Sequence, residues 1–315
     1  MQFVGHYRAS TDLVLLRLGG FRHWRRRFLL SVGAWLSLFA NADTHQPVSP
    51  APIVIHAQAV QDPTEEAYYG GILKAILQAS SAPGEVIDVQ FAAAEYTQTR
   101  WLAEVIHQNS HFVVWTMMSK ERELALHALR VPLFKGLLGV RALVVKKERL
   151  AEFKRVHSIG DLKRYKAGQA SNWPDTEILK FNQLPVDVGL NREVLYKMLS
   201  IGRFDYFPRG LVELEAEKYL IEQFDMAVVP GVYLYYPADI YYFVRKDNVD
   251  LIRRMETGWQ RISGSGLFDR LYNANPSVQR AQSELMKPHT IITLENPLLM
   301  EDTPVHDKSL WLQIK

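Results

Sequence analysis

Residues 53–80 read IVIHAQAVQDPTEEAYYGGILKAILQAS, and this stretch decides the fold class. It opens with a β-branched run at 53–55, which predicts a short buried strand. Pro63 is followed closely by two acids, a pattern typical of a helix N-terminus, and apolar residues at helical spacing then predict a helix to about Ser80. A buried strand followed by an amphipathic helix is the opening unit of an α/β protein.

The same alternation continues along the chain. A strand at 86–91, a helix over 97–108 and a strand at 112–115 complete a first α/β set, which predicts a parallel sheet covered by helices. A strand at 137–145 follows, and a second α/β set comes after it. We expect a short helix from Ser158, strands at 166–170, 186–188, 203–207, 226–229 and 240–244, and helices at 175–181, 192–199, 211–223 and 249–262.

Composition excludes several functions. The 315 residues contain no cysteine, so disulfides, thiolate metal ligands, a cysteine nucleophile and a lipid-modified N-terminal cysteine are absent. Six of the 37 Lys and Arg residues and one of the 34 acids precede residue 43, which leaves 31 basic and 33 acidic residues in the remainder. Because this remainder is nearly neutral, we expect no nucleic-acid partner.

The N-terminal region has the features of an export signal. Three arginines at 25–27 precede an apolar run at 28–40 and the small residues Ala40-Asn41-Ala42. The run is shorter than the ~20 residues that cross a bilayer, so residues 1–42 are interpreted as a cleavable signal peptide with cleavage after Ala42. A membrane anchor is the alternative. The prolines of 43–52 indicate an extended leader, and the mature protein is expected in the periplasm.

Four local patterns occur in a fixed order along the mature chain: SKER at 119–122, SIGDLK at 158–163, GRFD at 202–205 and YYFVRK at 241–246. In this order the chain resembles type 2 periplasmic solute-binding proteins, in particular the polar-amino-acid transporter family (extracellular solute-binding protein family 3). The resemblance spans roughly residues 53 to 275. It implies an α/β fold of two lobes joined by two crossover strands, with a ligand cleft between them.

Chain order then predicts the lobes. The first lobe is expected to combine 53–146 with 243–300, the second lobe to occupy 147–242, and 301–315 to form a tail. A hinge between such lobes lets a ligand contact both and favour the closed form.

The resemblance implies that Arg122, at the arginine of the family's Thr-x-x-Arg pattern, pairs with a ligand carboxylate. The alternative is a surface arginine paired with Glu121 or Glu123. The family often carries an aspartate for the ligand ammonium after its Gly-Arg-x-Asp pattern. Here Arg209 occupies that neighbourhood, which favours an anionic ligand; its alternative is a turn residue paired with Glu213.

Further cleft residues follow from the same comparison. Trp115 and Trp173 are expected to cover a flat or apolar part of the ligand. Asn172 and Trp173 precede a helix whose N-terminus binds ligand anions in the family, although a plain helix cap is equally consistent. Tyr68 is a candidate wall of the cleft, with a core position as its alternative.

Sequence motifs for catalysis or cofactors are lacking. The chain contains no nucleophile elbow, phosphate loop, dinucleotide fingerprint or calcium loop, so no cofactor is expected. His107 and His111 are four residues apart, but a helix end between them argues against zinc. Glu213, Glu215 and Glu217 are interpreted as a solvated helix face.

The sequence therefore predicts a non-catalytic periplasmic protein that captures a small carboxylate-bearing or anionic, amino-acid-like solute for ABC-type transport. Its expected partners are the solute and an inner-membrane ABC permease. Two alternatives stay open: a sensory subunit of the same fold that signals to a membrane partner, and a lyase or hydrolase on the same scaffold.

Overall fold

The computed structural model describes residues 51–59, 62–94, 96–107 and 111–314, which belong to one compact unit, Ser49–Lys315. The signal peptide expected at 1–42 and most of the leader lie outside the described residues. Within these ranges, no helix is both long enough and apolar enough to cross a membrane.

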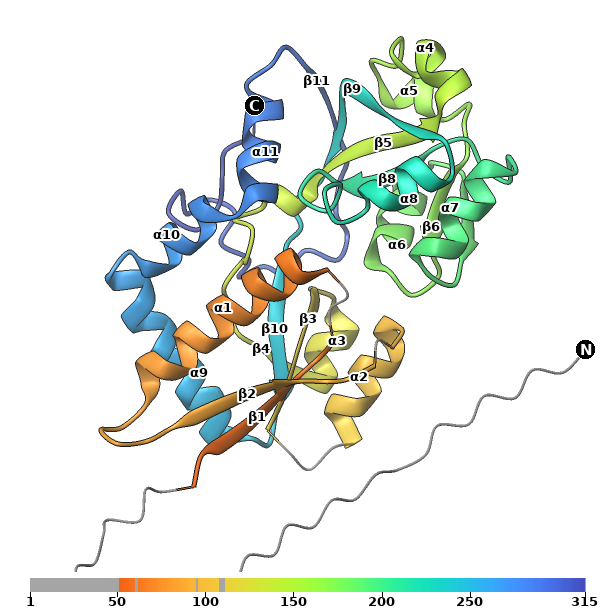
Figure 1. Cartoon of the computed structure of the whole chain (residues 1–315). Coiled ribbons are helices and arrows are strands. Elements are labelled where there is room, and N and C mark those ends of the chain that lie inside the picture. The colour runs from red at the N-terminus through yellow and green to blue at the C-terminus, as the bar shows by residue number, and fades with distance from the viewer. Residues whose placement is uncertain (1–50, 60–61, 95, 108–110, 315) are drawn as a thin grey trace, which may run out of the picture. The chain divides into compact units, whose positions relative to one another are not determined.

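The first lobe is built on a five-stranded sheet in the order β2-β1-β3-β10-β4 (Figure 1). The β-branched run becomes β1 (Ile53–Ala57), which pairs in parallel with β2 (Ile87–Phe91) and β3 (Phe112–Met117). β10 (Ile240–Arg245) runs antiparallel to β3 and to β4 (Leu126–Ala128). The parallel strands confirm the α/β prediction.

Helix α1 (Pro63–Ser80) begins where the sequence predicts it. Asp62 caps the helix by accepting hydrogen bonds from the amides of Thr64 (2.9 Å) and Glu65 (3.0 Å). The apolar face of α1 is buried against the first sheet. The other helices of this lobe are α2 (Gln98–His107), α3 (Lys120–Ala125) and α9 (Val249–Gly264).

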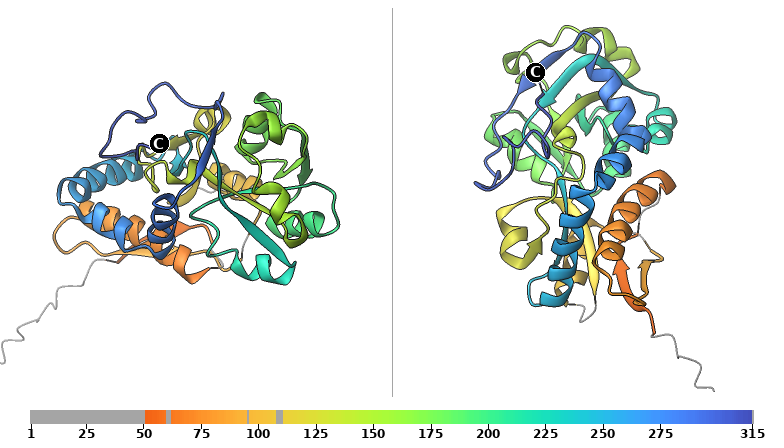
Figure 2. Two further views of the ribbon diagram at one scale, coloured as in Figure 1. Left: turned by 90° about the horizontal axis from the view of Figure 1, so that it is seen from above. Right: turned by 90° about the vertical axis from the view of Figure 1, so that its left-hand side faces the viewer.

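Helices α1 and α9 lie side by side, as Figure 2 shows in its right-hand view. Gly258 of α9 faces the backbone of α1 so closely that an added Cβ would lie 1.9 Å from the Ile76 carbonyl oxygen. The absence of a side chain at this position lets the two helix backbones approach each other.

The second lobe contains a four-stranded sheet in the order β11-β9-β5-β8 and a two-stranded sheet, β6-β7. An isolated bridge between Ala167 and Tyr206 joins β6 to the chain just before β8. The strands are β5 (Val140–Lys146), β6 (Ala167–Ala170), β7 (Val186–Gly189), β8 (Phe207–Gly210), β9 (Met226–Tyr235) and β11 (Thr290–Thr293).

Short helices surround these strands and continue toward the C-terminus. They are η1 (Leu137–Gly139), η2 (Lys147–Arg149), α4 (Leu150–Phe153), α5 (Ile159–Leu162), α6 (Pro174–Phe181), α7 (Arg192–Ser200), α8 (Lys218–Gln223), α10 (Leu267–Ala274) and α11 (Pro276–Leu285). The strand expected at 203–207 lies at 207–210 instead, and Pro208 is tolerated because β8 is the last strand of its sheet.

The helix expected over 211–223 starts only at Lys218, so this prediction is wrong for residues 211–217. These residues form turns in which Glu213 and Glu217 bind the buried Arg209. Glu217 is fully buried, and the interpretation of these glutamates as a solvated helix face is therefore also wrong. Pairing with a buried cation outweighs the helix propensity of the segment.

Three segments of the described chain connect the lobes: 129–139, between β4 and β5; 236–239, between β9 and β10; and 265–289, which carries α10 and α11 between α9 and β11. We expected β5 and β11 in the first lobe. Their pairing with β9 places both strands in the second sheet and corrects that assignment. An apolar run predicts a buried strand but does not specify which sheet it joins.

The C-terminal tail packs against the first two of these connecting segments. Trp311 is 1% exposed and lies against Gly136 of the first connection. The Leu312 amide donates to the Lys135 carbonyl (2.8 Å), and the Asn296 side chain donates to the Pro237 carbonyl (2.7 Å).

Candidate functional site

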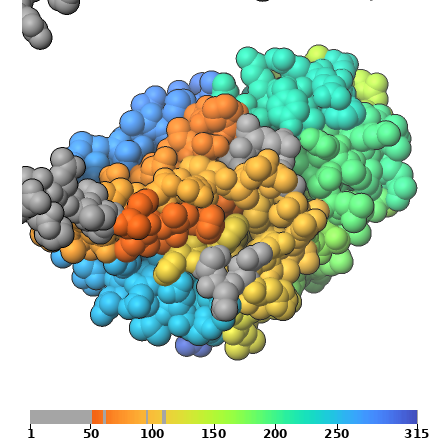
Figure 3. Space-filling model, turned by 60° about the horizontal axis from the view of Figure 1, so that its bottom comes forward, coloured from red at the N-terminus to blue at the C-terminus, as the bar shows by residue number. Residues whose placement is uncertain are grey.

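A cavity of about 380 Å³ lies between the two lobes. Cavities of this size hold small solutes. Figure 3 shows the face of the molecule on which first-lobe segments, orange to yellow, meet the green and teal segments of the second lobe. The main lining residues are Gln58, Glu65, Tyr69, Tyr96, Gln98, Trp101 and Trp115 from the first lobe, and Asn172, Trp173, Leu190, Asn191, Arg192, Glu193, Arg209 and Glu213 from the second.

Aromatic rings form much of the wall. Trp115 of β3 stacks on Tyr69 of α1, with ring centroids 5.0 Å apart and planes 19° apart. Its amide donates to Gln58 Oε1 (3.1 Å), which fixes the end of β3 beside the chain after β1. From the second lobe, Trp173 lies 4.7 Å from the Arg209 guanidinium. The cavity thus offers flat apolar surfaces from both lobes.

Arg122 does not line this cavity. Ser119 caps α3, and the Arg122 side chain, 7% exposed, extends toward the interface of the lobes. Its Nη1 donates to Thr116 Oγ1 and the Met117 carbonyl, both at 2.8 Å. Its Nη2 donates to Gln98 Oε1 (2.5 Å) and, across the interface, to the Asn172 carbonyl (3.0 Å).

These four acceptors are neutral, so Arg122 is a buried cation with no carboxylate bonded to it in the described part of the chain. Burial lowers the pKa of Arg122 to about 10, which still leaves the side chain charged at neutral pH. Its observed contacts tie the lobes together, while the carboxylate-binding role stays a prediction.

Arg209 lines the cavity but already has two carboxylate partners. Its Nε donates to both oxygens of Glu217 (3.0 and 2.9 Å), and its Nη2 donates to Glu213 Oε1 (2.8 Å). Burial opposes its charged form, yet the two glutamates raise the pKa of Arg209 well above its usual range. The alternative in which Arg209 pairs with Glu213 is therefore observed, together with an unforeseen partner, Glu217.

Arg141 extends the same buried network. It lies between Asp175 Oδ1 (2.8 Å) and Glu213 Oε2 (3.1 Å), and Tyr236 donates to the same Asp175 carboxylate. Asp175 belongs to the first turn of α6, which was expected to receive a ligand anion. The carboxylate of this first-turn residue is thus bound inside the protein by Arg141 and Tyr236. The sequence signal that we missed is an arginine inside an otherwise apolar strand.

Asn172 connects the lobes through its side chain as well as its carbonyl. Its Nδ2 donates to Thr99 Oγ1 of α2 (2.8 Å), and its Oδ1 is buried without a partner among the described residues. Tyr68, in contrast, is not among the lining residues. Its hydroxyl donates to the Leu133 carbonyl (2.5 Å), which corresponds to the core position considered as its alternative.

Glu65 lines the cavity, although the sequence indicates only an acid at the start of a helix. In the described part of the chain, its carboxylate has no hydrogen bond and no ion pair. Burial raises the pKa of Glu65 to about 7, although Arg192 acts in the opposite direction. Glu65 and Tyr69 are four residues apart on α1, which places them on one helix face. This spacing, next to a strand end, was the available signal.

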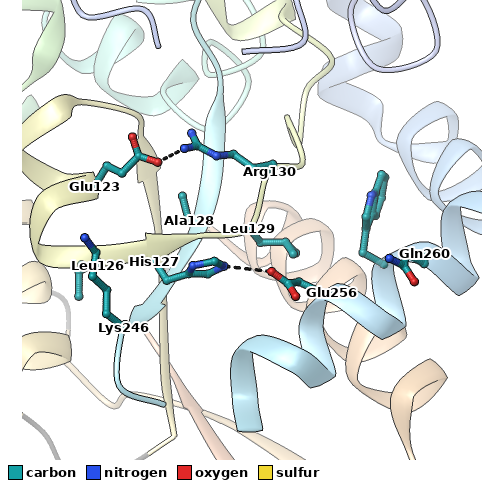
Figure 4. A pocket seen from close by; sticks show the side chains of 10 residues that line it. Glu123, Leu126, His127, Ala128, Leu129, Arg130, Lys246, Glu256 and Gln260 are labelled. Atoms are coloured by element: carbon teal, nitrogen blue, oxygen red, sulfur yellow. Dashed lines mark ion pairs between the residues drawn. The ribbon is translucent and has the colours of Figure 1, made fainter. Parts of the chain in front are cut away.

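A second cavity, of about 440 Å³, lies on the outer side of the first lobe between β4 and α9 (Figure 4). Its charged side chains are mostly paired: Arg130 with Glu123, and His127 Nε2 with Glu256 Oε1 at 3.4 Å. Only one lobe contributes to it. The cavity between the lobes is therefore the stronger candidate for a site that closes around a solute.

No metal centre is evident in the described ranges, where no group of three or more His, Asp or Glu side chains is suitably placed. α2 ends at His107, and β3 begins at Phe112.

Comparisons with known proteins show the fold. No family model and no curated protein matches the sequence. Among solved structures, the chain is similar to an ancestral arginine-binding protein bound to arginine, with a TM-score of 0.53, 17% identity, and coverage of 72% of this chain and 99% of that one.

Two further structures extend the comparison. A putative L-cystine ABC transporter from Listeria monocytogenes has a TM-score of 0.50 and 16% identity over 73% of this chain and 97% of that one. A histidine kinase sensor domain with similarity to periplasmic binding proteins has a TM-score of 0.51 and 14% identity over 72% and 96%. The described chain thus has the two-lobed α/β fold of the periplasmic solute-binding proteins.

Proposed function

We propose that this protein is a periplasmic solute-binding protein that captures a small, amino-acid-like solute and delivers it to an ABC permease. The observation that carries the proposal is the cavity of about 380 Å³, because residues from both lobes line it. A solute held there contacts both lobes at once and stabilises their closed arrangement. The fold supports such a role without identifying the solute.

The lining residues suggest how the solute is held. Trp115 and Tyr69 on the first lobe, with Trp173 on the second, enclose its flat or apolar part. Arg192 and Arg209 line the cavity on the second lobe, beside their glutamate partners, and in this proposal they also contact a solute carboxylate as the lobes close. In this proposal the protein binds its solute and does not transform it.

Thermal shift tests the proposal. The chain from Asp43 is screened against amino acids, amines, dicarboxylates, keto acids and aromatic acids. A ligand at a hundredfold excess over its dissociation constant stabilises by about 2.7 kcal/mol, which raises the melting temperature measurably. The hit should weaken at least tenfold in Trp173→Ala, which removes a cavity wall, and persist in Trp259→Ala, which changes the outer cavity. A hit that survives Trp173→Ala unchanged would place the site elsewhere.

Sensing is the second candidate function, because a histidine kinase sensor domain is among the similar structures. Both functions predict the same solute binding. Crosslinking of the ligand-loaded protein in bacterial envelopes separates them: capture of a permease supports transport, and capture of a membrane kinase supports sensing. Turnover of the bound compound would contradict both.

A further inference from the structure

The charge of the cavity differs from what its arginines suggest. Its charged lining residues are three acids and two arginines: Glu65, Glu193, Glu213, Arg192 and Arg209. Their formal charges sum to −1. The cavity therefore has no excess positive charge with which to attract a purely anionic solute.

Both arginines also have carboxylate partners inside the protein. Arg209 binds Glu213 and Glu217, as described above. Arg192, the first residue of α7, lies 3.8 Å from Glu217 Oε1. Their positive charge is thus largely compensated before any solute enters.

Glu65 is in the opposite situation. It lines the cavity on the first lobe, and its carboxylate forms no hydrogen bond or ion pair with the described residues. A partly buried carboxylate without a partner is energetically unfavourable. A cation that reaches it is therefore attracted more strongly than it would be by a carboxylate in water.

A neighbouring aromatic pair suits the same cation. Tyr69, one helical turn after Glu65, stacks on Trp115, and aromatic faces attract positive charge. The Glu65 carboxylate accepts hydrogen bonds, and an ammonium or guanidinium group supplies only donors.

We propose that Glu65 binds a positively charged nitrogen of the solute, so that the cavity selects compounds bearing a protonated amino or guanidino group. This inference rests on the proposed solute-binding function. Glu65 supplies a negative partner for this nitrogen from the first lobe. In the second lobe the sequence has Arg209, a cation, where such a partner was expected.

The pH dependence of binding follows from the surroundings of Glu65. Burial is the largest influence on its pKa, and Arg192 of α7, Glu213 and Glu217 before α8, and Asp62 of its own helix cap act on it as well. Together they raise the pKa of Glu65 to about 7. A bound cation favours the ionised carboxylate, so affinity should fall by about tenfold for each pH unit below 7.

Isothermal titration calorimetry at pH 8 and pH 6 tests this inference. The amine-bearing probes are phenethylamine, agmatine, L-phenylalanine and L-arginine, and the amine-free probes are 3-phenylpropionate and glutarate. We expect binding only among the amine-bearing probes, at least tenfold weaker binding in Glu65→Gln, and loss of the pH dependence in that variant. Glu66→Gln, which neutralises the neighbouring acid of α1 outside the cavity lining, should bind within twofold of the wild type.

The outcomes separate the two proposals. Glu65→Gln should be at least as stable as the wild type at pH 8, because it removes a buried charge, so weaker binding would not reflect unfolding. Two results would overturn the role of Glu65 and leave solute binding intact. One is that the amine-free probes bind as tightly as the amine-bearing probes, and the other is that Glu65→Gln binds with the affinity of the wild type. Failure of every probe and of the wider screen overturns the proposed function, and this inference with it.

Discussion

At the residue scale, Arg122 shows how one side chain joins distant parts of the chain. Its guanidinium contacts β3, α2 and the Asn172 carbonyl of the second lobe. Each contact is a hydrogen bond from a charged donor to a neutral acceptor, and such bonds are stronger than neutral ones. Loss of the side chain would leave several buried acceptors without a donor.

We therefore expect Arg122→Ala to lower the free energy of unfolding by about 3 kcal/mol. Urea denaturation followed by tryptophan fluorescence measures this change. Arg253→Ala is the control, because Arg253 is 75% exposed and pairs with Asp250 on the surface; its effect should stay within about 0.5 kcal/mol. Equal stability of the two variants would show that Arg122 does not fasten the lobes.

The residue scale is also where the sequence is least informative about the site. Of the six predicted binding residues, Trp115, Asn172, Trp173 and Arg209 line the cavity, whereas Tyr68 and Arg122 do not. The sequence identifies residue types suited to a ligand, but it does not show which of them the protein uses internally. Arg209 bound by Glu217 and Arg141 bound by Asp175 are examples.

At the element scale, the contact between α1 and α9 depends on a glycine. An added Cβ at Gly258 would lie 1.9 Å from the Ile76 carbonyl oxygen, a backbone atom that cannot rotate away. The helices would have to move apart, which also loosens the apolar contacts between them.

We expect Gly258→Ala to destabilise the protein by about 2 kcal/mol or more through this overlap. Gly71→Ala is the matched control, because Gly71 lies inside α1 and an added Cβ meets nothing within 4 Å. That variant should gain about 0.5–1 kcal/mol from helix propensity. Chemical denaturation of both variants decides the matter: destabilisation of both by similar amounts would mean that backbone overlap is not the cause.

Most elements could be predicted because their signals are local. Asp62, Pro63 and the apolar spacing that follows specify the start and the face of α1 within a few residues. The strand at β8 and the start of α8 could not be predicted in this way. Their positions depend on the ion pairs of Glu213 and Glu217 with Arg209, whose geometry arises only in the folded chain.

At the scale of the whole molecule, the C-terminal tail packs beside two of the crossings between the lobes, 129–139 (the first) and 236–239 (the second). Asp239, in the second crossing, accepts hydrogen bonds from the Phe134 amide (2.9 Å) and the Gly136 amide of the first. Trp311 of the tail covers Gly136, and its Nε1 lies 3.4 Å from the Tyr235 hydroxyl oxygen at the end of β9. The tail thus packs on the region where any hinge motion takes place.

Trp311→Ala should lower the free energy of unfolding by about 3–5 kcal/mol, because it leaves a large cavity beside both crossings. Met286→Ala is the control. Met286 is 88% exposed just after α11, so its removal should change stability by less than about 0.5 kcal/mol. Differential scanning calorimetry measures both changes. A melting temperature of Trp311→Ala equal to that of the control would show that the tail does not stabilise the crossings.

The sequence by itself determined the α/β class, the order of most elements and the resemblance to two-lobed binding proteins. These properties follow from apolar periodicity, capping residues and breakers that act over a few positions. Only the tertiary structure decided that β5 and β11 join the second sheet, that Arg122 is engaged within the protein, and that Glu65 lines the cavity without a partner among the described residues. The physical reason is that the partner of a buried strand or charge is chosen by residues far away in the chain, and one sequence does not reveal them.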